Sequence, residues 1–311
     1  MSHASGSKDT TLEVNGYATI VLEDAELEAV QALAAAAFGG DGSSGDSKGF
    51  FETSQKKARA EKATPDVGYR HVSSETVPDD DEDGLASVSS TKEMLSYRKN
   101  HKSKSCIPQR LEQSFAAAFA MLEAKAVGEV QEMLCRTGHH SATLATLLDD
   151  PVANAKVGAI SSSVLSAMTY VGVKSEEKEG GRGKTNKAAG GGSKQRGMLL
   201  CPAHEDRGVV TIIIGRAAGS VLQVFDKVAA EWTSVESTLD DGTAVIITGN
   251  TLHRAVAIGD DAGAGAGVSN GAQHRVIGGV HGGGVVTTRE SCVKNTQRTC
   301  PPWTECAQGH W

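Results

Sequence analysis

The sequence has no long apolar segment. Of its 311 residues 39% are hydrophobic. No stretch of them approaches the roughly 18 consecutive apolar residues that a membrane-spanning helix needs. The first residues, Met1 to Asp9, are polar and unlike a secretory signal peptide. We therefore expect a cytoplasmic protein that does not enter a membrane.

The sequence also lacks an excess of positive charge. Its formal net charge is -7 at pH 7, whereas a protein that binds nucleic acid usually presents a basic patch. The glycines do not form a phosphate-binding pattern of strand, loop and helix, which argues against a nucleotide site. We expect a small-molecule substrate and no nucleic acid, and nothing in the sequence indicates an oligomeric state.

The six cysteines form no compact disulfide framework. Reduced thiols are the simpler interpretation. In the tail, Cys292, Cys300, Cys306 and His310 lie near one another in sequence and could enclose a structural zinc ion. Their spacing lacks the Cys-x-x-Cys pair typical of such sites, so reduced thiols stay the preferred interpretation.

What the sequence does contain is a series of short β-prone segments in its second half. They are rich in β-branched residues, are separated by turns with Asp, Gly or Lys, and lie at 209–214, 221–224, 243–248, 274–280 and 285–293. This pattern predicts successive antiparallel strands. We also expect a long helix over 109–136, because apolar side chains recur there at spacings of three and four: Leu111, Phe115, Phe119, Leu122, Ala126, Val130 and Leu134.

Two distant pieces of sequence carry the residue types of a metal site. Residues i and i+2 of an extended strand face the same side, so His204 and Asp206 can converge on one ion. His274 offers a second imidazole, and His253 is a rival for the same role. Two histidines and one carboxylate are the facial ligand set of non-heme Fe(II) oxygenases, which leaves positions open for a co-substrate and dioxygen.

Three further residues are candidates for binding a carboxylate. Arg289 and Ser291 share one strand face, and a guanidinium fork next to a hydroxyl matches the distal end of a dicarboxylic acid. The alternative for this pair is a solvated edge strand. Tyr170 ends a β-prone segment that begins at Ser161, and it fits either a carboxylate-binding hydroxyl or an ordinary half-buried strand tyrosine.

Taken in order, these pieces resemble the 2-oxoglutarate- and Fe(II)-dependent oxygenases of the isopenicillin N synthase-like superfamily. The similarity is strong over 161–291. Before that it is faint and rests on Gly49-Phe50-Phe51, Gly68-Tyr69 and Lys92-Glu93-Met94. The matching pieces are His204-x-Asp206, Leu222-Gln223-Val224, Trp232, Gly249-Asn250-x-Leu252, His274-Arg275-Val276 and Arg289-x-Ser291.

The resemblance implies a mostly β fold with flanking helices around a double-stranded β-helix, a cupin-like jelly-roll core. It implies Fe(II) bound by His204, Asp206 and His274, with no catalytic residue beyond these ligands. His274 is preferred over His253 because Gly249-Asn250-x-Leu252 fills the position that precedes the last ligand in the family.

The resemblance further implies 2-oxoglutarate as the co-substrate, held by Arg289 and Ser291 with Tyr170 nearby, and dioxygen as the oxidant. The expected activity is that of an oxidoreductase, a dioxygenase that oxidises a small organic substrate, with hydroxylation as the expected outcome. Substrate identity, and the choice between hydroxylation, desaturation and ring closure, stay open.

We expect three regions: an amino-terminal region with supporting helices over 1–150, the jelly-roll over 151–298 and a polar tail over 299–311. Glycine-rich or charged stretches at 39–45, 78–84, 174–197 and 259–267 are expected to be loops. The family usually continues after Arg289-x-Ser291 with an apolar, aromatic strand, whereas this chain becomes polar. Two alternatives therefore stay open: an isopenicillin N synthase-like oxidase that does not use 2-oxoglutarate, and a catalytically inactive jelly-roll binding protein.

Overall fold

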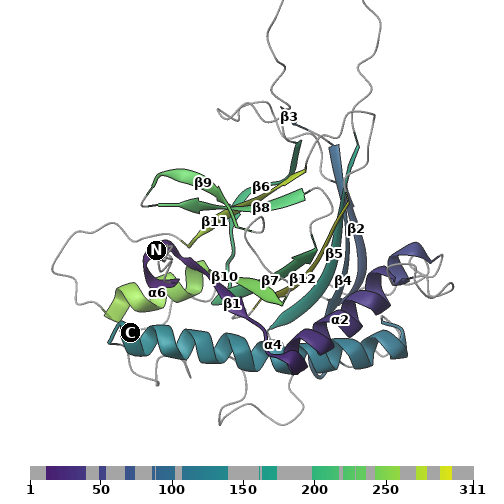
Figure 1. Ribbon diagram of the computed structural model, residues 1–311, viewed down its shortest axis with the longest axis horizontal. Coiled ribbons are helices and arrows are strands. Elements are labelled where there is room, and N and C mark those ends of the chain that lie inside the picture. Colours follow the sequence, from purple (N-terminus) through teal and green to yellow (C-terminus); the bar gives the residue numbers. More distant parts are fainter. Residues whose placement is uncertain are drawn as a thin grey trace, which may run out of the picture.

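Two β-sheets face each other, with helices on the outer side of one of them (Figure 1). The computed structural model describes residues 12–39, 49–53, 67–73, 86–87, 89–101, 107–138, 161, 163–173, 198–216, 220–227, 229–235, 242–259, 271–278 and 288–295. The expected tail over 299–311, most of the expected loop residues, and Cys300, Cys306 and His310 of the candidate zinc site lie outside these residues.

Among the described residues the larger sheet has seven strands, and all of its neighbouring strands are antiparallel. In spatial order they are β1 (Tyr17–Val21), β10 (Thr243–Thr248), β7 (Val210–Arg216), β12 (Thr288–Asn295), β5 (Val164–Val173), β4 (Ser89–Tyr97) and β2 (Gly68–Ser73). Strands from before and after position 150 therefore pair within one sheet.

In the described part of the chain the smaller sheet has five strands, of which only the pair β3 and β6 is parallel. In spatial order they are β3 (Ala86–Ser87), β6 (Met198–Glu205), β11 (Gln273–Gly278), β8 (Ser220–Asp226) and β9 (Glu231–Ser234). Neighbours in space are mostly not neighbours in sequence. Non-consecutive antiparallel pairing in two facing sheets is the arrangement expected for a jelly-roll.

The helices are α1 (Leu12–Asn15), α2 (Asp24–Phe38), α4 (Gln109–Arg136) and α6 (Asn250–Gly259), with a 3-10 turn η1 at Phe50–Glu52. Both α2 and α4 lie along the larger sheet, on the side away from the smaller one (Figure 1). None of the helices in the described residues is long and apolar enough to span a membrane.

Two separate hydrophobic cores lie on the two faces of the larger sheet. The outer core joins α2 and α4 to the sheet, and Phe115 and Phe119 of α4 pack there with strand residues such as Ile212. The inner core lies between the sheets, where Ile213 and Met168 pack with residues of the smaller sheet. Alternation along each strand produces this division, because successive side chains point to opposite faces.

The mostly β fold with flanking helices is confirmed. The helix expected over 109–136 and the strand expected over 243–248 have these bounds in the structure. All seven residues of the expected apolar stripe on α4 are buried, so the stripe is part of the core. Helix α6 was not expected from the sequence, where the segment around His253 shows only a second His-Arg piece.

Candidate metal centre

Adjacent strands of the smaller sheet bring the two candidate histidines together. His204 lies near the end of β6, and Asp206 directly follows that strand. His274 lies near the start of β11, which pairs antiparallel with β6 so that His274 is directly opposite His204. Directly opposite residues of an antiparallel pair carry side chains on the same face, so both imidazoles point to one side of the sheet.

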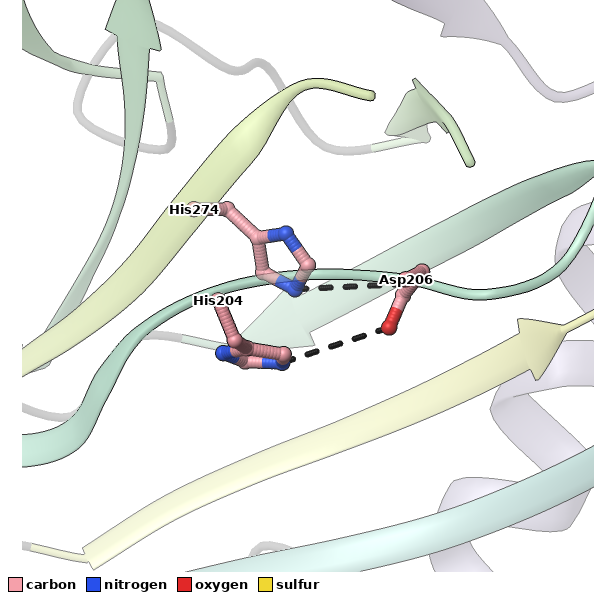
Figure 2. Close-up of side chains that lie close together, drawn as sticks. All are labelled: His204, Asp206 and His274. Carbon is pink, nitrogen blue, oxygen red and sulfur yellow. Dashed lines mark ion pairs between the residues drawn. The ribbon is translucent and has the colours of Figure 1, made fainter. Parts of the chain in front are cut away.

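Figure 2 shows these three side chains converging on one point between the strands. The His204 Nε2 atom lies 3.9 Å from Asp206 Oδ1, and the His274 Nε2 atom lies 3.9 Å from Asp206 Oδ2. The two imidazole ring centroids are 4.2 Å apart. Within the described residues, one ligand atom from each of the three side chains lies within 4.8 Å of the others.

The donor set fits a divalent metal ion. Imidazole nitrogen and carboxylate oxygen bind such ions at about 2.0–2.2 Å, so two donors on one ion lie within about 4.4 Å of each other. Both histidine-to-aspartate distances, at 3.9 Å, meet this limit. The Nδ1 atom of His204 donates to the Pro202 carbonyl at 2.9 Å, which turns the other ring nitrogen toward Asp206.

An irregularity in β6 shapes the surroundings of His204. The register changes from His274 opposite His204 to Val276 opposite Cys201, so three residues of β6 match two of β11. This bulge places Cys201 and His204 on the same face, and Sγ of Cys201 lies 3.9 Å from Nδ1 of His204.

The hydrogen bond with Cys201 is the main cause that raises the pKa of His204 to about 9. The charges of Cys201 and Asp206 and the Pro202 carbonyl act in the same direction, and burial opposes them. Burial raises the pKa of the Cys201 thiol, but His204, Lys92 and Tyr170 together lower it below its usual value. A metal ion at His204 must therefore displace a proton near neutral pH.

Asp206 is held by residues from two other elements. Thr211 of β7 donates its hydroxyl hydrogen to Oδ2 of Asp206 in a short hydrogen bond. The backbone N–H of Asn250, at the start of α6, donates to the carbonyl of Asp206 at 2.8 Å. Gly249 fits closely against this turn, because a Cβ atom there would lie 2.1 Å from the carbonyl oxygen of Gly208.

His253 lies apart from the three converging side chains. It is part of α6, and its Nε2 atom is 2.7 Å from the hydroxyl oxygen of Thr248. Burial, together with the charge of Lys227, lowers the pKa of His253 to about 4. The structure thus brings His274, rather than His253, together with His204 and Asp206.

The three carboxylate-binding candidates lie on adjacent strands of the larger sheet. Tyr170 of β5 is buried, and its side chain belongs to the inner core. The backbone register places position 289 of β12 opposite Tyr170, and position 291 opposite Met168, another residue of the inner core. The side chains of Arg289 and Ser291 lie outside the described part of the structure.

No family model matches the sequence, and no curated protein matches it either. Solved structures, in contrast, are similar to this chain in fold. A full-length protein of Neurospora crassa in complex with alpha-KG is 18% identical, with 91% of this chain and 75% of that chain covered and a TM-score of 0.57. A 2OG-Fe(II) oxygenase family protein from Caulobacter crescentus is 17% identical, with 92% and 78% covered and a TM-score of 0.57.

A third structure, the dioxygenase for auxin oxidation from rice, is 15% identical, with 91% of this chain and 74% of that chain covered and a TM-score of 0.52. The chain has the fold of the 2OG-Fe(II) oxygenases. The expected jelly-roll core is therefore confirmed. Within this oxygenase fold, the three converging side chains lie between the two sheets.

The residues that orient Asp206 in the oxygenase fold were not found from the sequence. The sequence does single out Thr211, because it is the one polar side chain in the β-prone run from Val209 to Ile214. A hydroxyl in such a run needs a partner once buried, and here that partner is Asp206. Asn250 had no comparable signal, since its contribution comes from the backbone N–H.

Proposed function

We propose that this chain is an Fe(II)- and 2-oxoglutarate-dependent dioxygenase that oxidises a small organic substrate. The observation that carries the proposal is the convergence of the donor atoms of His204, Asp206 and His274 within 4.8 Å of one another. The fold supports it, because structures of that fold include the Neurospora crassa protein in complex with alpha-KG and, in a further structure, with alpha-KG and thymine.

In this proposal Fe(II) is held by the two histidine Nε2 atoms and the carboxylate of Asp206. When bound together, Fe(II) and 2-oxoglutarate supply the chemistry that lets dioxygen oxidise a C–H bond of the substrate, with hydroxylation as the expected outcome. The chain contributes a fixed set of three ligands on one side of the ion. Thr211 donates to the carboxylate of Asp206, and the N–H of Asn250 holds the Asp206 backbone through its carbonyl oxygen.

The co-substrate is assigned to Arg289 and Ser291, with Tyr170 beside them. The register supports this, because positions 289 and 291 are opposite Tyr170 and Met168, whose side chains belong to the inner core. Opposite residues share a face of the sheet, so these positions lie on the face that looks toward the smaller sheet. A guanidinium there would bind the distal carboxylate of 2-oxoglutarate through two parallel hydrogen bonds.

The test compares two adjacent carboxylates. Asp206→Ala removes a proposed ligand. Glu205→Ala removes its neighbour, which points to the other side of the strand. We expect Glu205→Ala to bind Mn(II) and to form succinate from 2-oxoglutarate with Fe(II), and Asp206→Ala to do neither. Calorimetric titration with Mn(II) and a succinate assay read out the two steps.

Measuring oxygen consumption by the same proteins separates the alternatives. Oxygen consumption without succinate would favour an oxidase that does not use 2-oxoglutarate. Metal binding without oxygen consumption would favour an inactive binding protein. If Asp206→Ala bound Mn(II) as tightly as Glu205→Ala, the proposed metal site would be wrong.

A further inference from the structure

We propose that Lys92 binds a carboxylate, or a similar anionic group, on the organic substrate, so that the preferred substrate is an organic acid. This inference rests on the proposed function, since it concerns the same face of the larger sheet as the positions assigned to the co-substrate. It assigns a substrate class and a specificity-determining residue that the three metal ligands and the co-substrate residues do not supply.

Lys92 belongs to a row of residues that crosses three strands. It is directly opposite Tyr170 in the pairing of β4 with β5, and Tyr170 is directly opposite position 289 in the pairing of β5 with β12. Directly opposite residues share one face of a sheet. Since the Tyr170 side chain is part of the inner core, the row lies on the face that looks toward the candidate metal centre.

The side chain of Lys92 is directed along this row. Its ammonium nitrogen lies 5.3 Å from the centre of the Tyr170 ring, and the residue is half-buried. Within the described residues, no carboxylate forms an ion pair with this ammonium group. The neighbouring carboxylate, Glu93, instead accepts a hydrogen bond from the hydroxyl of Tyr69 at 2.8 Å, on the opposite face of β4. A partly desolvated cation of this kind favours an anionic ligand.

The Tyr170 ring, over which Lys92 lies, links this row to the strand that carries His204. Tyr170 belongs to the inner core, Cys201 of β6 packs against that core, and Sγ of Cys201 lies 3.9 Å from Nδ1 of His204. Residues of β4, β5 and β6 meet in the inner core, where Met94 and Cys201 pack against the cluster that contains Leu200 and Tyr170. A substrate whose anionic group binds Lys92 would therefore extend toward His204.

A second anion site next to that of the co-substrate is consistent with the strand spacing. Neighbouring strands lie about 4.8 Å apart, so the backbones at positions 92 and 289, on either side of Tyr170, are separated by about 10 Å. One carboxylate is much smaller than this separation. We therefore assign position 289 to 2-oxoglutarate and Lys92, on the other side of the tyrosine, to the substrate.

The test uses pairs of ligands that differ only in charge. Monocarboxylates from butanoate to phenylacetate are each compared with the corresponding primary amide, by calorimetry. The protein is measured both loaded with Mn(II) and saturated with 2-oxoglutarate, and free of both. We expect at least one acid to bind the wild-type protein about tenfold more tightly than its amide, as a charged hydrogen bond implies.

Lys92→Met should remove that preference, and Lys92→Arg should retain it. Lys99→Met is the matched control, because Lys99 pairs with Glu123 at 3.8 Å on the helix side of the protein, and it should behave as wild type. Thermal unfolding checks that each variant is folded. If Lys92→Met is not folded, Lys92→Gln takes its place, because it also removes the charge and should also remove the preference.

Three results would overturn the inference: amides that bind wild type as tightly as acids, a preference that survives in Lys92→Met, or a Lys92→Met variant that loses affinity for 2-oxoglutarate instead of the acids. Failure of the proposed function would give a different result, because the wild-type protein would then bind neither Mn(II) nor 2-oxoglutarate. The measurement on the metal-free protein would still report whether Lys92 selects acids over amides.

Discussion

Replacing Thr211 with valine removes one hydroxyl group from the surroundings of Asp206 and leaves the shape of the side chain almost unchanged. The hydroxyl donates to Oδ2 of Asp206, the oxygen that also faces His274. Without that hydrogen bond the carboxylate can rotate away from the position in which it meets both imidazoles. We expect the variant to fold normally and to bind metal less tightly.

The size of the effect follows from burial. A hydrogen bond to a charged group contributes about 1.5–3 kcal/mol, and outer residues that orient metal ligands typically change affinity 10- to 100-fold. Thr211 is 1% exposed, so water cannot replace its hydroxyl. The Asp206 side chain is 17% exposed, so water can partly satisfy the carboxylate from the other side. We therefore expect the affinity for the metal ion to fall by about tenfold, or about 1.4 kcal/mol, which is near the lower end of the 10- to 100-fold range.

The assay is the dissociation constant for Mn(II), measured by calorimetry at constant pH on wild type, Thr211→Val and Thr169→Val. Thr169 is the matched control, a buried threonine on β5. It lies between Met168 and Tyr170, so it points to the opposite face of the sheet. Thermal unfolding of the metal-free variants shows whether either substitution changes stability.

The reasoning would be refuted if Thr211→Val bound Mn(II) as tightly as wild type while remaining folded. Equal losses in Thr211→Val and Thr169→Val would also refute it, because the effect would then come from general strain in the sheet. A loss confined to Thr211→Val, with unchanged stability of the metal-free protein, is the expected pattern.

Two further predictions concern stability. Gly249→Ala should lower the free energy of unfolding by about 3 kcal/mol, because its Cβ atom would lie 2.1 Å from the carbonyl oxygen of Gly208. Gly128→Ala, with nothing within 4 Å on α4, should raise it slightly in the same urea titration; equal effects would contradict the close fit. His253 has a pKa of about 4 in the folded protein, lowered from 6.5 by burial and by Lys227, so its stabilising contribution is present above pH 6.5 and is lost as pH falls toward 4. Urea unfolding at pH 7.5 and pH 5 should show about 1 kcal/mol more loss in wild type than in His253→Gln, and equal losses would contradict it.

The local order of apolar and β-prone residues was enough to predict some of the helices and strands. Helix α4 follows from the spacing of its apolar residues, and β10 follows from six consecutive β-prone residues bounded by turns. Helix α6 was missed because a short segment such as Leu252 to Val256 suits helix and strand alike. Its start is fixed by a long-range contact, the hydrogen bond from the Asn250 N–H to the Asp206 carbonyl.

The residues of the candidate metal centre could be named from the sequence. That they lie close together in space could not be derived from the local sequence pattern. His204 and Asp206 are close by alternation along an extended segment. Their proximity to His274 depends on the register of β6 with β11, which includes an extra residue in β6. A bulge of this kind depends on the partner strand, so the single sequence does not reveal it. The roles of Arg289, Ser291 and Tyr170 stay predictions.

The two faces of the larger sheet serve different purposes, and this division has a consequence for how such a protein can change. On β7, Ile212 packs toward the helices, whereas Thr211 and Ile213 face the other side. Substitutions in the helix layer can therefore change thermal stability without changing the side chains on the face of the candidate metal centre. Changes in stability and changes around that centre would involve alternate residues of the same strands.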